Sequence, residues 1–327
     1  MIGHLGQHKP DAERTGRQHC RPVRRLARDL SGLRGGRLAE WGGMSPSLQG
    51  AAIYTLDMRS LNLLGCLAIL VVSLPAIQST HSMGQTKSPR TLLAVFAHPD
   101  DEATVSPVLA KYAAEGVTVH LAVATDGRLG ATQHSGIPAG DALAAVRSQE
   151  VKCAAEKLGI RPPILFGLHD QMKMGEGLAV LQGQLQILRE EVRRLFTTLK
   201  PDVVITWGAS GWTGHPDHRL VGSVVTEVFE SQAWEKPTRL YYPALPTGSL
   251  PSGSPMPLAT VDERYLTVRV PVSEADYEKA KASWLCHKSQ YMPAQVESMH
   301  GLIKASLKNT AYFRPLIAEQ GPRSSLF

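Results

Sequence analysis

The stretch Thr-Leu-Leu-Ala-Val-Phe-Ala-His-Pro-Asp-Asp-Glu, residues 91–102, joins a continuous apolar run to a cluster of histidine and acidic side chains. An apolar run such as 91–96 is typical of a strand that is buried on both faces of a parallel sheet. A helix is expected over 102–115, where Gly116 would end it, and a second strand over 117–124. This order of strand, helix and strand predicts a parallel pair joined by a crossover helix.

The same alternation continues along the chain. The apolar pattern predicts further helices over 141–158, 178–199 and 217–233, and further strands over 164–166, 202–207 and 239–244. Residues 246–260 are rich in Pro, Gly and Ser and are expected to form a surface loop. A strand over 265–270 and helices over 273–290 and 294–308 are expected as additions to the same domain. The pattern as a whole predicts an α/β fold with a mostly parallel sheet and helices on both of its faces.

The charge of the chain is concentrated near its beginning. The 327 residues carry a formal net charge of +6, of which residues 1–60 hold +5. The rest is close to neutral, which argues against a nucleic-acid-binding domain, since such domains need many uncompensated Lys and Arg side chains. With 43% hydrophobic residues the chain can bury a core, so composition also excludes a wholly disordered protein.

The first 85 residues are not expected to belong to the fold. Residues 1–57 lack sustained periodicity and are interpreted as a disordered extension or a misassigned start, with a targeting segment or a nucleic-acid arm as the rival. Residues 58–85 begin Met-Arg-Ser, continue with an apolar run over 61–77 and end with small polar residues. That order predicts a signal peptide or an uncleaved N-terminal anchor. The interpretation makes Met58 the working start and the protein exported, periplasmic or extracellular.

Two of the four cysteines lie in the expected domain. Cys153 and Cys286 are far apart in sequence and form no CxxC motif. They are interpreted either as one disulfide formed in an oxidising compartment or as two buried free thiols.

Four polar clusters follow the predicted strands. Because ligands bind outside the carboxyl ends of the strands in open α/β sheets, we expect these clusters to build one site. They are His98–Glu102, Thr125–Gly127, His169–Asp170 and His215–His218.

The first and fourth clusters have the composition of a metal site for hydrolysis. Such a site needs three protein ligands and an open position for water. His98 and Asp101 are three residues apart, so both can face one point where a strand turns into a helix, and His218 is expected to supply the third ligand from across the sheet. Two histidines and one aspartate suit zinc, although the same set also accepts iron or manganese.

The remaining residues of these two clusters have the chemistry to act on a substrate. Asp100 is free to act as general base on the attacking water. His215 can donate a hydrogen bond to a developing oxyanion, and Asp217 is expected to orient His215.

Other polar residues nearby also have ordinary structural explanations. Glu102 opens the expected helix, where an acid counters the helix dipole. It is therefore either part of the site or a residue that stabilises the start of the helix. His169 and Asp170 are interpreted as loop residues. Asp126 precedes a glycine and is either part of the site or an ordinary turn residue.

The motifs Ala97–Glu102 and Gly214–His218 resemble the PIG-L/LmbE-like family of zinc-dependent de-N-acetylases. That family includes N-acetylglucosaminyl-phosphatidylinositol deacetylases and the deacetylases of the mycothiol and bacillithiol pathways. The resemblance covers about residues 90–300. Three further stretches fit it: Thr125–Gly127, Arg147-x-x-Glu150 and His287–Gln290. His169–Asp170 departs from it, because many relatives have a Tyr-Pro-Asp type loop there.

The resemblance implies a fold and a set of roles. The fold is a Rossmann-like three-layer α/β sandwich with the active site at the carboxyl ends of the strands, in an LmbE-like deacetylase domain over 90–315. Zinc would be bound by His98, Asp101 and His218. Asp100 would be the base and then the acid, and His215 would stabilise the oxyanion. Asp126 and Arg147 would contact substrate, although Arg147 is also explained as a helix-surface arginine paired with Glu150.

The expected function is therefore a zinc-dependent N-deacetylase. Its substrate would be a small-molecule N-acetylated sugar or glycoconjugate of the N-acetylglucosamine type. No nucleic-acid partner is expected, membrane contact would come only through the N-terminal segment, and the oligomeric state is left open. The alternative is a non-catalytic, zinc-containing carbohydrate-binding protein on the same fold. A dinucleotide-binding oxidoreductase lacks support, because no GxGxxG follows the first strand.

Overall fold

Strand β1 (Thr91–Phe96) lies between two parallel neighbours inside a seven-stranded sheet of order β3-β2-β1-β4-β5-β9-β8. The computed structural model describes residues 89–252 and 258–327, so the expectations for 1–57 and 58–85 lie outside the described residues. The first five strands of the order are parallel, whereas β9 is antiparallel to both β5 and β8. Their bounds are β2 Thr118–Thr125, β3 Ile164–Leu168, β4 Val203–Ile205, β5 Arg239–Pro243, β8 Val268–Pro271 and β9 Thr310–Pro315.

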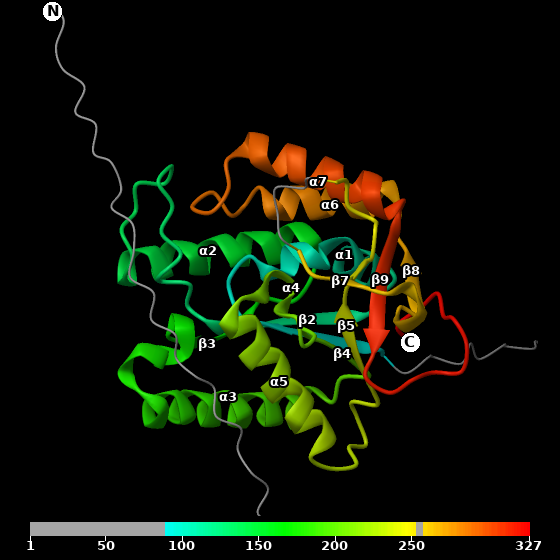
Figure 1. Ribbon diagram of the computed structural model, residues 1–327, viewed down its shortest axis with the longest axis horizontal. Helices are drawn as coiled ribbons and strands as arrows, with labels where there is room; N and C mark the ends of the chain where they lie inside the picture. The colour runs from blue at the N-terminus through cyan, green and yellow to red at the C-terminus, as the bar shows by residue number, and fades with distance from the viewer. Residues whose placement is uncertain (1–88, 253–257) are drawn as a thin grey trace, which may run out of the picture. The chain divides into compact units, whose positions relative to one another are not determined.

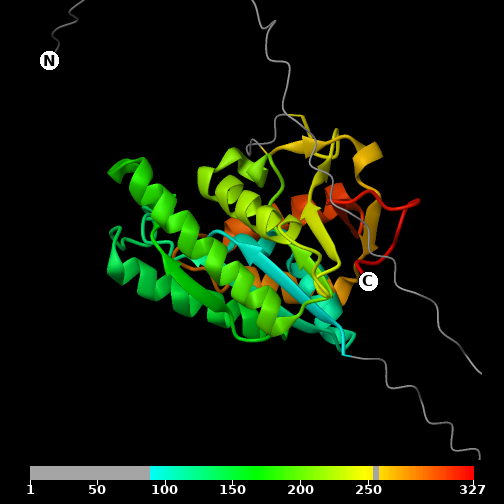
Figure 2. The same ribbon diagram turned by 90° about the horizontal axis from the view of Figure 1, so that it is seen from below.

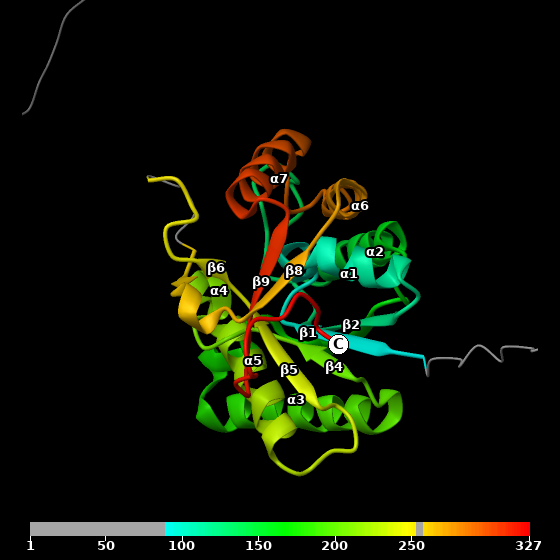
Figure 3. The same ribbon diagram turned by 90° about the vertical axis from the view of Figure 1, so that its right-hand side faces the viewer.

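Helices cover both faces of this sheet, and the predicted three-layer α/β sandwich is confirmed (Figure 1). Along β1 the side chains alternate between the two cores: Leu92 and Phe96 belong to one, and Leu93 and Val95 to the other. One face carries α1 (Ser106–Ala114), α2 (Asp141–Leu158) and α6 (Glu274–Trp284), with α7 (Pro293–Leu307) against α6; the other carries α3 (Leu178–Leu199) and α5 (Pro216–Glu230) (Figure 3). Because β1 is apolar and buried at every position after Thr91, it can contribute to both cores.

The order of the strands creates a crevice at the end of β1. The chain passes from β1 to β2 and β3 on one side, then returns to place β4 on the other side of β1 (Figure 2). The connections that leave β1 and β4 therefore diverge, and this is where α/β sheets bind ligands. The described stretches contain no helix of the length and apolarity that crossing a bilayer requires.

The first predicted helix begins later than expected. Residues 101–104 form a 3₁₀ turn, and α1 starts only at Ser106. The reason is that the carboxylate of Asp101 accepts the backbone N–H groups of Ala97 and His98, which folds the chain into a tight turn before a helix can start. The predicted helix over 273–290 is also shorter, because α6 ends at Trp284 and a turn follows it.

The sequence pattern does not predict strand β9 or the packing of the residues after it. Strand β9 pairs with both β5 and β8, and it has no clear apolar alternation of its own. The fold also continues beyond 315: Leu326 is fully buried, and its backbone N–H donates to the hydroxyl of Tyr112 on α1 at 2.8 Å. The predicted 265–270 strand starts at Val268 because Glu263–Tyr265 form a 3₁₀ turn. Two short strands, β6 (Leu245–Pro246) and β7 (Thr260–Val261), pair with each other at the two ends of the region 246–260 expected to be a loop.

Cys153 on α2 forms a disulfide with Cys286, in the turn that follows α6. The structure thus selects the disulfide over the two free thiols. The cross-link joins positions 133 residues apart and ties the turn after α6 to α2.

Replacing both cysteines by serine, as the pair Cys153→Ser and Cys286→Ser, is expected to lower the free energy of unfolding by about 2–5 kcal/mol, because the cross-link restricts a long loop in the unfolded chain. Chemical denaturation of the purified protein measures this. Reductant should destabilise the wild type and leave the double variant unchanged. Equal stability of the two proteins under oxidising conditions would contradict the expectation.

Candidate active site

A cavity of about 370 Å³ lies at the carboxyl ends of β1 and β4. Its size falls in the range of small-molecule sites, roughly 300–1,000 Å³. Its lining contains every residue given a catalytic, substrate-binding or metal role from the sequence except Asp126: His98, Asp100, Asp101, Arg147, His215, Asp217 and His218. The tertiary structure therefore brings together two motifs that are more than a hundred residues apart.

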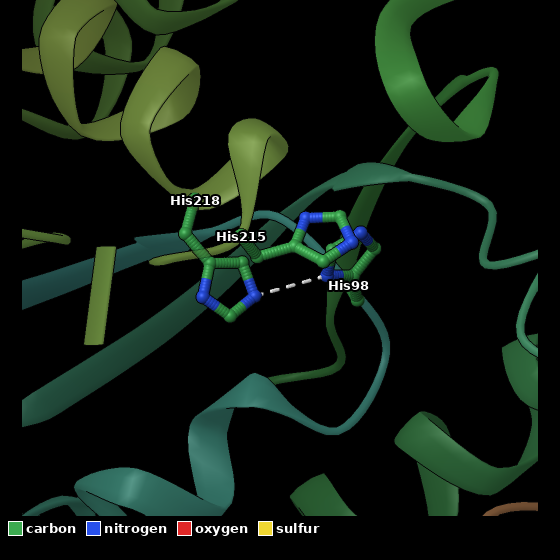
Figure 4. A group of neighbouring side chains, drawn as sticks. All are labelled: His98, His215 and His218. Atoms are coloured by element: carbon green, nitrogen blue, oxygen red, sulfur yellow. Dashed lines mark hydrogen bonds between the residues drawn. The ribbon is translucent and has the colours of Figure 1, made fainter. Parts of the chain in front are cut away.

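The three predicted metal ligands face one another. His98 Nδ1 lies 3.1 Å from His218 Nε2, as the dashed line in Figure 4 shows. Asp101 Oδ1 lies 3.1 Å from the same His218 nitrogen, and Asp101 Oδ2 lies 3.7 Å from His98 Nδ1. Two imidazole nitrogens and one carboxylate oxygen thus converge on a small volume, as the donor atoms of a metal site do.

The hydrogen bond made by the outer ring nitrogen, the one that points away from the other histidine, indicates which nitrogen of each ring carries the proton. His98 Nε2 lies 3.1 Å from Asp217 Oδ2, and His218 Nδ1 lies 2.8 Å from the carbonyl oxygen of Gly211. An ionised carboxylate and a carbonyl oxygen only accept, so both outer nitrogens carry protons. In neutral rings the inner nitrogens then present lone pairs to each other, an arrangement that a proton or a metal ion between them stabilises. The donor set therefore fits a metal ion whose histidine ligands are oriented by outer hydrogen bonds.

The electrostatics of the site favour positive charge at this point. Burial lowers the pKa of His98, but its hydrogen bonds with Asp101 and Asp217 outweigh burial and raise the pKa to about 10. Burial raises the pKa of Asp101, while His218 and His98 bring it well below its usual range. A site that stabilises a proton on imidazole so strongly also attracts a metal cation, and the two compete.

Asp101 is held in place by groups from two strands. Its Oδ2 accepts the backbone N–H groups of Ala97 and His98 at 2.9 Å each, and the indole Nε1–H of Trp207 at 3.3 Å. Oδ1 is left to face His218. The indole of Trp207 also stacks on the His218 ring, with centroids 4.6 Å apart. Asp101 therefore has the geometry of a ligand that binds through one oxygen.

Helix α5 carries His218 into the site because it approaches β4 closely. At Gly222 a Cβ atom would lie 2.2 Å from the carbonyl oxygen of Trp207, so only glycine allows this contact. Pro216 in the first turn and His215 as the N-cap begin the helix immediately before His218.

Two other groups of potential ligand atoms also lie within 4.8 Å: His98, His215 and His218, and His98, Asp170 and Asp217. The first is disfavoured because His215 Nδ1 accepts the backbone N–H of Asp217 at 3.2 Å, which places the proton of the neutral ring on Nε2. The second is disfavoured because both oxygens of Asp170 accept backbone N–H groups. Hydrogen bonding thus favours the set predicted from the sequence.

The role predicted for Asp217 needs correction. Its Oδ2 accepts from His98 and from the backbone N–H of Gln171 at 2.7 Å, whereas its only hydrogen bond to His215 is through the backbone. The carboxylate therefore orients the predicted metal ligand His98, and not the predicted oxyanion donor His215. His215 stays suited to donation through Nε2: burial, reinforced by the charge of His98, lowers its pKa and keeps the ring neutral.

Asp100, the predicted base, is held by two donors from distant segments. Arg147 on α2 donates to Asp100 Oδ1 at 2.9 Å, and the hydroxyl of Tyr291 donates to Asp100 Oδ2 at 3.2 Å. Arg147 is only 3% exposed and also donates to the carbonyl oxygens of Pro99 and Gly127. The alternative of an exposed arginine paired with Glu150 is therefore wrong: Glu150 instead accepts from Ser289.

Sequence reasoning missed Tyr291. The available signal was its position directly after the His287–Gln290 motif. Its nearness to Asp100 and its burial raise the pKa of its phenol well above the ordinary value, so the hydroxyl stays protonated and donates. Tyr291 lines the cavity beside the predicted base.

Several other polar residues have structural roles. Asp126 is not among the described residues that line the cavity. Its carboxylate accepts hydrogen bonds from the guanidinium of Arg128 at 2.5 and 2.8 Å, so the structure favours the turn-residue interpretation. Asp170 supports the loop after β2, in agreement with the loop interpretation. Glu102 is not a helix-dipole acid: it is fully buried and pairs with His287 at 2.6 Å.

Comparison with known proteins agrees with this geometry. Residues 93–229 match PIG-L, described as GlcNAc-PI de-N-acetylase. Two relatives are named 1D-myo-inositol 2-acetamido-2-deoxy-alpha-D-glucopyranoside deacetylase. The one from Actinosynnema mirum is 31% identical over 61% of this chain and 80% of its own length. The one from Mycobacteroides abscessus is 31% identical over 50% of this chain and 63% of its own length. The chain therefore belongs to the PIG-L family.

A solved structure supports the fold alone. It is described as the zinc inhibited form of teicoplanin deacetylase Orf2, and it is 16% identical, with a TM-score of 0.50. The match covers 69% of this chain and 97% of that one.

Replacing the outer carboxylate by Asp217→Asn is expected to weaken metal affinity about 10–100-fold, because His98 loses its charged acceptor. Competition with a chromophoric chelator measures the affinity. Asp262→Asn, an exposed cap far along the sequence, is the matched control and should bind metal as the wild type does. Unchanged affinity in Asp217→Asn would count against the orienting role of Asp217.

Replacing the hydroxyl next to the base by Tyr291→Phe is expected to lower kcat about tenfold to a hundredfold, since a hydrogen bond to a charged group is lost. Metal content should stay at the wild-type value. Tyr265→Phe, at an exposed tyrosine, is the control. A kcat within twofold of wild type would show that Tyr291 does not position Asp100.

Proposed function

We propose that this protein is a zinc-dependent hydrolase that removes the N-acetyl group from an N-acetylglucosamine-type sugar or glycoconjugate. The observation that carries the proposal is the convergence of His98 Nδ1, His218 Nε2 and Asp101 Oδ1 beside Asp100 in one cavity. Family membership and the printed activities of the relatives support the same reaction. Two histidines and a carboxylate are a ligand set that zinc accepts in hydrolases.

The residues of the site divide the work of amide hydrolysis. A bound zinc ion would supply Lewis acidity at the amide carbonyl and a lowered pKa of the attacking water. Asp100 takes a proton from that water, and the protonated Asp100 then delivers it to the leaving nitrogen. His215 donates its Nε2–H to the oxyanion that develops on the carbonyl oxygen. The C–N bond breaks, and the products are acetate and a free amine.

Arg147 and Tyr291 keep Asp100 in place during this cycle. Arg147 binds Oδ1 and Tyr291 binds Oδ2, so the carboxylate cannot rotate freely. Positioning of this kind matters because proton transfer requires a heavy-atom distance of about 2.6–3.2 Å.

A non-catalytic carbohydrate-binding protein is the alternative function. Such a protein would need neither an aspartate held by two donors next to the ligand set nor a neutral histidine with a free N–H. Retained zinc without turnover of any N-acetylated sugar would favour it.

We also propose that the protein is exported. The composition of residues 58–82 supports this, and so does the Cys153–Cys286 disulfide, since disulfides persist in oxidising compartments. N-terminal sequencing of the protein isolated from its native cells tests it: an intact start at residue 1 in the cytoplasm would end the proposal.

The reaction is tested by Asp100→Asn. We expect the variant to bind zinc normally and to release free amine from N-acetylglucosamine conjugates about 10²–10⁴-fold more slowly, because the acid–base group is lost. Asp126→Asn, the same change outside the cavity lining, should retain wild-type activity. A chelator should abolish amine release, and added zinc should restore it. Wild-type rates in Asp100→Asn would contradict the assignment of the base.

A further inference from the structure

One wall of the cavity is apolar and takes no part in the proposed chemistry. Three of its side chains come from α7, at a spacing of four residues that places them in one stripe along the helix. The other three come from the end of α6, from β6 and from the residues before β7. We call this set the α7 wall: Leu245, Leu258, Trp284, Met299, Ile303 and Leu307.

The stripe on α7 is incompletely covered by the described residues. Met299, Ile303 and Leu307 are only half-buried, although each is a large apolar side chain. They open onto the same cavity as Asp100 and the metal ligands. A ligand bound next to Asp100 and the predicted metal ligands would therefore contact apolar surface on this side of the cavity.

Trp284 is a buried aromatic member of the α7 wall. It is 6% exposed, and its indole Nε1–H has no hydrogen-bond partner among the described residues. The indole nitrogen is not exposed to the cavity, so Trp284 contributes apolar ring surface to the α7 wall rather than a hydrogen-bond donor.

The charges of the lining restrict that ligand. Among the described lining residues, the one Lys or Arg side chain is Arg147, and it is engaged with Asp100. No unengaged lysine or arginine of the described lining is therefore available to a phosphate group. A polyol on the α7 wall would lose hydrogen bonds to water without replacement there.

We propose that the α7 wall binds an apolar aglycone, an alkyl or aryl group attached to the reducing end of the N-acetylated sugar. The inference rests on the proposed deacetylase function and adds the substrate class. It separates this chain from its relatives, whose printed names place inositol, a polyol, on the same carbon of the sugar.

The test compares three glycosides of N-acetylglucosamine, with methyl, hexyl and inositol aglycones, each below its micelle concentration. The zinc-loaded full chain is assayed for amine release. We expect kcat/KM to be at least tenfold higher for the hexyl than for the methyl glycoside, because each buried methylene contributes about a factor of three to four. The inositol glycoside should be no better than the methyl one.

Two variants on α7 locate the effect. Ile303→Ser is expected to lose most of the preference for the hexyl over the methyl glycoside, measured as the ratio of their kcat/KM values. Leu302→Ser makes the same kind of change one residue away, outside the lining of this cavity, and should keep the preference. Ile303→Ala gives the same comparison if the serine variant does not fold.

The outcomes separate the inference from the function on which it rests. No amine release from any of the three glycosides overturns both. Amine release at equal rates from the methyl and hexyl glycosides, or a preference for the inositol glycoside, contradicts the proposed binding role of the α7 wall but not the deacetylase function. A hexyl preference that survives in Ile303→Ser and Ile303→Ala also contradicts that role, because residues outside this wall would then be responsible.

Discussion

The carboxylate of Asp101 is the interaction on which the site depends. This one buried group accepts the backbone N–H groups that close the turn after β1 and the indole N–H of Trp207 after β4. It also faces His218 at the start of α5. A buried carboxylate needs such partners, because an unpaired charge away from water is strongly unfavourable. The same contacts that satisfy Asp101 therefore set the distance between His98 and His218. The turn after β1 and the predicted ligand set thus share the same contacts, and Gly222 lets α5 approach β4 closely.

A second network brings the C-terminal third of the chain to the predicted base. The turn after α6 is cross-linked to α2 by Cys153–Cys286 and bonded to it through Glu150 and Ser289. From this turn Tyr291 reaches Asp100, and from α2 Arg147 reaches the same carboxylate. Helix α7, which packs against α6, extends this layer to the cavity, whereas β8 and β9 continue the sheet. The layer that holds Asp100 thus also carries most of the surface that we assign to the aglycone.

Fold and chemistry are separable in this architecture. The predicted ligand set comes from the turn after β1 and the start of α5, within the stretch 93–229 that matches the PIG-L family, while the apolar wall comes from segments after residue 244. Chemistry at the acetamide requires atoms placed to within a fraction of an ångström, which short connections at strand ends provide. Selection of an aglycone requires only shape and polarity, which helices at the rim can vary without disturbing the metal ligands.

The sequence by itself determined the βαβ order, the ends of α2 and α3, and the two motifs that supply His98, Asp101 and His218, because apolar periodicity and strand-end position are local properties. It did not determine the partners of side chains that are distant in sequence. The carboxylate of Asp217 orients His98 instead of His215, Arg147 is buried against Asp100, and Glu102 pairs with His287. Tyr291 and β9 were likewise invisible, since the first is defined by a contact across 191 residues and the second by pairing with β5 and β8. Only tertiary structure decides such pairings, because hydrogen bonds and burial depend on which groups meet in space and not on their separation along the chain.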